Sequence, residues 1–125
     1  MSIVQDWVDK AEADFAGAET LDGRQSAPLP DLVCYHCQQS AEKYLKAYLL
    51  ARGASPPRIH DLVQLLNLCC VFDPSLSTLS AEIQALDAYG VMIRYPGMSA
   101  TVQESKDALR FARTIRAGLR SRLGL

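Results

Sequence analysis

Five stretches of this 125-residue chain carry apolar residues at helical spacing, and short runs rich in proline, glycine or serine separate them. The stretches cover approximately residues 3–21, 31–52, 61–72, 80–93 and 101–123. None shows the alternation of apolar and polar residues that is typical of a strand. Amphipathic helices bury their apolar faces against one another, so the sequence predicts an all-α, up-and-down bundle of about five helices.

The ends of several helices carry recognisable capping residues. Ser2 with Gln5, and Thr101 with Glu104, have the spacing of a capping box at the start of the first and last helices. Gly53 is suited to end the second helix, because glycine readily adopts the left-handed conformation that closes a helix. These signals set the predicted bounds of the helices independently of their apolar faces.

The length of the chain indicates one domain, residues 1–125, with a single core. No apolar run approaches the roughly 20 residues that a membrane-spanning helix needs. The N-terminal segment carries acidic residues where a signal peptide carries basic ones. We therefore expect a cytoplasmic protein that does not contact a membrane.

The four cysteines form two close pairs, Cys34 with Cys37 and Cys69 with Cys70. Thiolates at short spacing are zinc ligands in many proteins, which makes a metal site one interpretation. Both pairs fall inside predicted helices, however, and no glycine-containing knuckle folds the first pair around a metal. Buried free thiols are the favoured interpretation, with no metal and no cofactor.

Charge is distributed unevenly along the chain, although the net charge is only −1. Residues 1–31 have seven acidic side chains and two basic ones, a balance of −5, whereas residues 99–125 have six basic and two acidic ones, a balance of +4. The basic side chains of the last helix form a stripe that suits either a polyanion such as RNA or the acidic first helix. The small net charge favours pairing with the first helix.

The second predicted helix has two contrasting faces. Its core side is expected to comprise Val33, Cys34, Cys37, Gln38, Ala41, Tyr44, Leu45, Tyr48 and Leu49. The opposite side carries His36, Gln39, Glu42, Lys43 and Lys46. One interpretation is a solvated face with an ion pair between Glu42 and Lys46, which are four residues apart. The other is a surface that binds a ligand.

Further polar residues lie next to breaks in the helical pattern. His60 follows a double proline, and Arg94 and Tyr95 precede the break before the last helix. An imidazole, a guanidinium and an ammonium group together suit a phosphate, so Lys43, His60 and Arg94 are predicted to converge on an anion-binding groove. For His60 alone, a helix N-cap or a satisfied, partly buried imidazole is the alternative.

The segments "YHCQQSAEKYLKAYLLARG", "RIHDL" and "RYPG" together resemble the prokaryotic branch of the HEPN domain family, over residues 3 to 118. The resemblance implies a small helical bundle that binds a nucleotide or RNA phosphate. It also implies a homodimer and a nucleotidyltransferase protein as partner, in a toxin–antitoxin pair. The residues that carry the implied ligand contacts, or a polar dimer seam, are His36, Gln39, Glu42, Lys43, Lys46, His60, Arg94 and Tyr95.

Many HEPN proteins resemble metal-independent ribonucleases in which a histidine follows an arginine after four to six residues. Arg94 matches that arginine, but the positions where the histidine belongs, 99 to 101, hold Ser99, Ala100 and Thr101. Without that imidazole the usual general acid or base is missing, so we expect binding without catalysis. The alternatives are a ribonuclease toxin with a non-standard site of Arg94, His60 and His36, and a purely structural interaction module.

Overall fold

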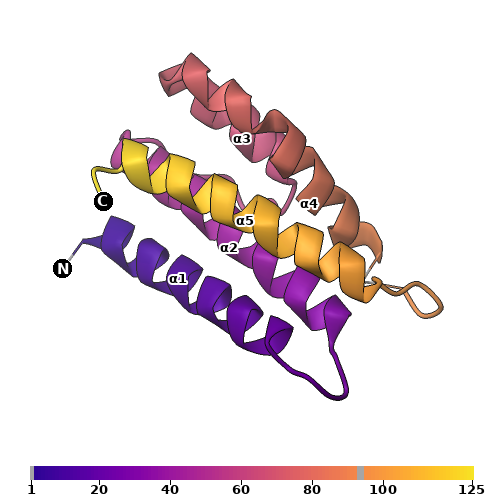
Figure 1. Cartoon of the computed structure of the whole chain (residues 1–125). Helices are drawn as coiled ribbons and strands as arrows, with labels where there is room; N and C mark the ends of the chain where they lie inside the picture. Colours follow the sequence, from indigo (N-terminus) through magenta and orange to yellow (C-terminus); the bar gives the residue numbers. More distant parts are fainter. Residues whose placement is uncertain (1, 93–94) are drawn as a thin grey trace.

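The computed structural model describes residues 2–92 and 95–125, and these residues form five α-helices and one short 3₁₀ helix (Figure 1). The elements are α1 (Ile3–Asp22), α2 (Pro30–Ala51), α3 (Leu62–Phe72), η1 (Pro74–Leu79), α4 (Ser80–Met92) and α5 (Val102–Arg122). No described residue lies in a strand, and no described helix is both long and apolar enough to cross a bilayer. The predicted all-α bundle is therefore confirmed.

Helix α2 is the centre of the bundle. It packs against each of the other four α-helices, with α1 on one side and α3 and α4 on the other (Figure 1). As a result 13 of its 22 residues are buried. An amphipathic helix at the surface buries one face, whereas α2 also buries part of its polar side.

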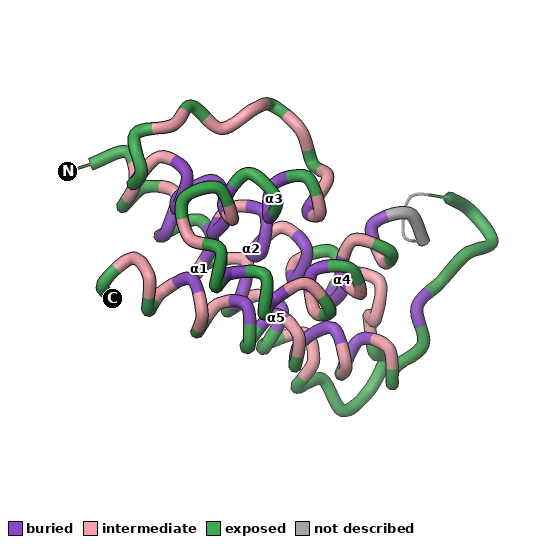
Figure 2. The backbone as a smooth tube through the Cα atoms, turned by 90° about the horizontal axis from the view of Figure 1, so that it is seen from above, coloured by how far each residue is buried: buried purple, intermediate pink, exposed green. Residues whose placement is uncertain are grey.

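The core is built from apolar side chains of all the helices. Figure 2 marks the buried positions along the backbone of each helix. The largest fully buried side chains include Tyr44, Leu45, Leu49, Leu62, Leu65, Leu76, Ile83, Leu86, Ile115 and Leu119. All nine residues expected on the core side of the second helix are buried, as predicted. This core holds the inner turns of α2, α3 and α4 in place, and these turns surround the cavity described below.

Two capping boxes were predicted, and one of them forms. The Thr101 hydroxyl accepts a hydrogen bond from the backbone N–H of Glu104 at 3.0 Å, and the Glu104 carboxylate accepts one from the backbone N–H of Thr101 at 2.9 Å. Ser2 also accepts from the backbone of Gln5, at 3.1 Å. The Gln5 side chain, however, donates to the Asp9 carboxylate at 2.8 Å, because a hydrogen bond to a charged acceptor is stronger.

Candidate functional site

The polar side of α2 divides into two groups with different partners. His36 and Lys43 turn toward α1, where both contact the carboxylate of Asp14. The distances to this carboxylate are 2.9 Å from His36 Nδ1 and 2.5 Å from Lys43 Nζ. These two predicted ligand residues therefore join α2 to α1, and neither lines the cavity described below.

The second group surrounds Glu42, which is only 4% exposed. Its carboxylate accepts from Lys46 Nζ at 3.2 Å and lies 3.0 Å from His60 Nδ1. The Lys46 ammonium group is also buried, and it lies 5.8 Å from the centre of the Trp7 ring. The predicted Glu42–Lys46 ion pair exists, but it is buried, so a solvated face is the wrong description of this part of α2.

His60 joins this buried group to the surface. Its side chain is 67% exposed, although its Nδ1 atom faces the buried Glu42 carboxylate. A carboxylate at Nδ1 favours the tautomer in which Nδ1 carries the proton, which leaves Nε2 as an acceptor. The predicted N-cap alternative is wrong, because Asp61 caps α3 by accepting from the backbone N–H of Gln64 at 3.1 Å.

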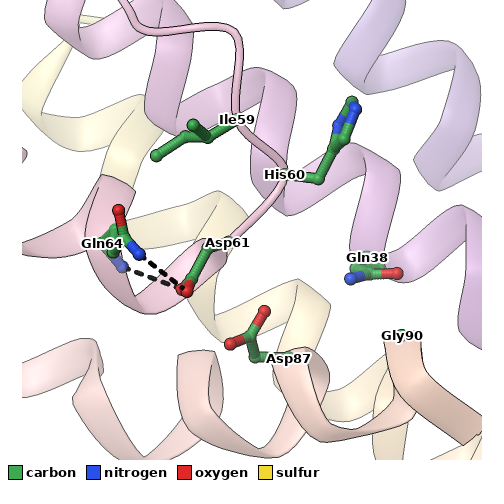
Figure 3. Close-up of a pocket in the computed structure, with 7 residues that line it drawn as sticks. All are labelled: Gln38, Ile59, His60, Asp61, Gln64, Asp87 and Gly90. Atoms are coloured by element: carbon green, nitrogen blue, oxygen red, sulfur yellow. Dashed lines mark hydrogen bonds between the residues drawn. The ribbon is translucent and has the colours of Figure 1, made fainter.

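A cavity of about 440 Å³ lies beside His60, between α2, α3 and α4 (Figure 3). It is lined by Gln38, Ile59, His60, Asp61, Gln64, Asp87 and Gly90, and we call it the Gln38 cavity. Among the described residues that were predicted to bind a ligand, only His60 lines it. Gln38 is buried on the core side of α2, as predicted. Its amide was the one signal in the sequence that the core side of this helix also carries a polar group.

The other predicted site residues lie elsewhere. Gln39 is half-buried on α2 and makes no side-chain hydrogen bond with another described residue. Tyr95 is 59% exposed in the connection between α4 and α5. Arg94 lies outside the described residues. The convergence of Lys43, His60 and Arg94 on one groove therefore stays a prediction, and Lys43 contacts α1 instead of the cavity.

The basic stripe of α5 pairs with the acidic helix α1, which was the favoured prediction. Arg116 and Arg120 both bind the Glu12 carboxylate, at 2.7 Å and 3.0 Å, and the Tyr44 hydroxyl donates to the same carboxylate. Burial raises the pKa of Glu12, but the hydrogen bonds from Arg116 and Tyr44 and the two guanidinium charges outweigh it and hold the pKa below its usual value. Lys106 pairs with α1 as well, through Asp22.

The cysteines are free thiols, as predicted. Cys34, Cys37 and Cys69 are buried, and burial raises the pKa of Cys34 and that of Cys69 to about 12. Such thiols are protonated at neutral pH and unreactive. Within the described part of the chain, no three His, Cys, Asp or Glu residues are grouped so that they could hold a metal ion.

Known proteins share both the sequence pattern and the fold. The model of the HEPN domain matches residues 4–121. The crystal structure of TT1696 from Thermus thermophilus superposes with a TM-score of 0.77 and 27% sequence identity, over 97% of this chain and 98% of that chain. The crystal structure of ST0689, an archaeal HEPN homologue, superposes with a TM-score of 0.76 and 25% identity, over 98% of both chains. No curated protein matches the sequence. Because the domain match spans nearly the whole chain, this chain belongs to the HEPN domain family.

Proposed function

We propose that this chain binds a nucleotide or RNA phosphate and acts as a homodimer with a nucleotidyltransferase partner in a toxin–antitoxin pair. The observation that carries the proposal is the position of His60. His60 is one of the residues that line the Gln38 cavity, and its imidazole is held by the buried Glu42 and is otherwise largely open to solvent. An imidazole held in this way can donate to a phosphate oxygen when it is protonated.

The cationic groups near the cavity differ in their availability. Lys46 is committed to Glu42, and Lys43 to Asp14, so both serve mainly to hold α2 in place. Arg58, two residues before His60, is exposed and forms no ion pair with another described residue. The proposed phosphate contacts are therefore His60 together with Arg94 and Tyr95, which follow the end of the cavity-lining helix α4 in the sequence.

Equilibrium titration with ATP and with a short single-stranded RNA tests this proposal. Binding is expected to saturate at about 50 mM salt and to weaken at about 200 mM, because phosphate contacts release counterions. His60→Ala and Arg94→Ala should each weaken binding, whereas Arg24→Ala, in the exposed α1–α2 loop, should not. Absence of saturable binding at low salt would remove the proposal and leave a structural interaction module.

The dimer and the partner protein are separate parts of the proposal. Light scattering at micromolar concentration should give twice the mass of the 13.7 kDa chain. This chain, tagged and purified from its native cells, should retain a nucleotidyltransferase protein in a complex that survives gel filtration. A monomeric mass, or separate elution of the two proteins, contradicts the corresponding part without affecting the test of ligand binding.

The pair formed by His60 and Glu42 supports a second candidate function, a ribonuclease with a non-standard site. A carboxylate that fixes one imidazole nitrogen and exposes the other is the arrangement of a general base in many hydrolases. His60 would take the proton of the RNA 2′-hydroxyl as the 2′-oxygen bonds to phosphorus, and would return it to the 5′-oxygen as the P–O5′ bond breaks, which leaves a 2′,3′-cyclic phosphate. Arg94 would stabilise the charge on the phosphate. Incubation with mixed RNA tests it: cleavage by the wild type that is lost in both His60→Ala and Arg94→Ala supports the enzyme, and intact RNA excludes it.

A further inference from the structure

The Gln38 cavity is lined mainly by amide and carboxylate side chains. Its volume of about 440 Å³ falls within the range of sites for small molecules. Among the described residues that line it, His60 alone has a side chain that can be cationic. The remaining polar lining groups are two amides, of Gln38 and Gln64, and two carboxylates, of Asp61 and Asp87. Carboxylate oxygens accept hydrogen bonds, so this lining suits a ligand group that carries hydrogen-bond donors.

Gln38 is the central polar group of this cavity. It is 4% exposed and lines the cavity (Figure 3), and no described residue forms a hydrogen bond with its side-chain amide. Among the described residues, the buried side-chain polar atoms without a partner do not include those of Gln38, so its amide reaches solvent through the cavity. An unpaired amide that faces a cavity is therefore suited to a ligand that offers both a donor and an acceptor.

Gly90 makes room for this amide. A Cβ atom added at Gly90 would collide with the amide group and lie 2.7 Å from Cδ of Gln38, which is much closer than van der Waals contact allows. The absence of a side chain on α4 at this point thus lets the Gln38 amide lie against the helix backbone (Figure 3). Gln38 on α2 and Gly90 on α4 thus form one polar wall of the cavity together.

The other walls are fixed by hydrogen bonds within the fold. The Asp61 carboxylate caps α3 and accepts from both the backbone and the side chain of Gln64. The Asp87 carboxylate accepts from the backbone N–H of Leu62 at 3.1 Å. Ile59 adds an apolar surface against which a flat ring can pack. The cavity is therefore shaped before any ligand enters.

We propose that the Gln38 cavity binds the adenine ring of a nucleotide, with the Gln38 amide paired to the edge of the ring. This inference rests on the proposed function and adds the identity of the base. A glutamine amide matches the N6 donor and the N7 acceptor of adenine. The carboxylate-rich walls favour an exocyclic amino group and disfavour a carbonyl oxygen at the same position. The phosphates of the nucleotide then lie outside, beside His60.

Calorimetric titration with ATP, inosine triphosphate and tripolyphosphate tests this proposal. Inosine triphosphate has a carbonyl oxygen in place of the 6-amino group of adenine, and tripolyphosphate has no base. We expect ATP to bind about tenfold or more tightly than inosine triphosphate, the discrimination expected from one bidentate pair. Equal affinity for ATP and inosine triphosphate overturns the adenine site but leaves phosphate binding in place. If ATP, inosine triphosphate and tripolyphosphate all fail to bind, the proposed function itself is removed.

Two variants link the preference to Gln38. Gln38→Leu should abolish the preference for ATP and leave tripolyphosphate binding unchanged, and Gly90→Ala should do the same by displacing the amide. The matched control is Gln25→Leu, in the exposed α1–α2 loop, which should keep the preference. Thermal unfolding confirms that each variant is folded. A folded Gln38→Leu protein that still prefers ATP overturns the assignment of Gln38.

Discussion

Replacing the buried carboxylate of Glu42 by an amide should strongly destabilise the fold. Glu42→Gln keeps the shape of the side chain but leaves the Lys46 ammonium group buried without its counterion, at 8% side-chain exposure. Breaking a buried ion pair in this way costs about 3–5 kcal/mol. The Trp7 ring, 5.8 Å from the Lys46 ammonium group, attracts this cation in the wild type and in the variant alike, so it does not change the difference. The expected loss of unfolding free energy is thus roughly 3–5 kcal/mol.

Urea denaturation followed by circular dichroism measures this loss. With a denaturant dependence of about 2 kcal/mol per molar urea, the unfolding midpoint should fall by roughly 1.5–2.5 M. The double variant Glu42→Gln with Lys46→Met should recover most of the stability, because it removes the unpaired charge and keeps the apolar stem. Glu19→Gln is the matched control, since Glu19 pairs with Arg113 at the surface with 47% side-chain exposure, and it should cost less than about 1 kcal/mol.

A Glu42→Gln midpoint no lower than that of the control would refute a large cost of the unpaired Lys46 charge. That result would show that the Lys46 ammonium group reaches water or another partner in solution. A double variant as unstable as the single one would also contradict it, because the cost would then come from packing and not from the unpaired charge.

Three further predictions follow from the same structure. The pKa of Glu12 is lowered from 4.5, so the ion pairs of Glu12 stabilise the fold above that pH, and this contribution is lost as the pH falls through the folded-state pKa. The difference in melting temperature between the wild type and Glu12→Gln should therefore shrink from about pH 7 to about pH 3. A constant difference contradicts this. Thr101→Ala removes the cap of α5 and should lower the unfolding free energy by about 1 kcal/mol in urea titration, whereas no change would mean that the capping box does not persist in solution. A thiol reagent should label Cys70, which is partly exposed, before the three buried cysteines, and equal labelling rates in native protein would show that the core opens readily.

The helices could be predicted from sequence because their signals are local. Spacing of apolar residues identified each helix, and the breaks between them located the ends. Gly53 illustrates this, since it follows α2 with a φ of +82°, a left-handed conformation that glycine adopts at no steric cost. In the first capping box, the Gln5 side chain does not bond back to the start of the helix, because it donates to Asp9, one turn further along α1.

The site was less predictable because it depends on how the helices cross. Helical spacing puts His36, Lys43 and Lys46 on one side of α2, but the position of α1 decides that the first two contact Asp14 while the third contacts Glu42. Gln38 could have been suspected from sequence as an amide on an otherwise apolar face. Its relation to Gly90 could not, since it arises only when α2 and α4 pack together.

The central position of α2 also determines how the domain can open. Every other α-helix packs on α2. Helix α1 or α3 can therefore detach while α2 keeps its remaining contacts, but α2 cannot detach unless the whole chain unfolds. In amide hydrogen exchange, the inner turns of α2 should then exchange only through global unfolding, and the ends of α1 and α3 through smaller fluctuations. Gln38, which is proposed to pair with adenine, would thus belong to the last part of the chain to lose its order.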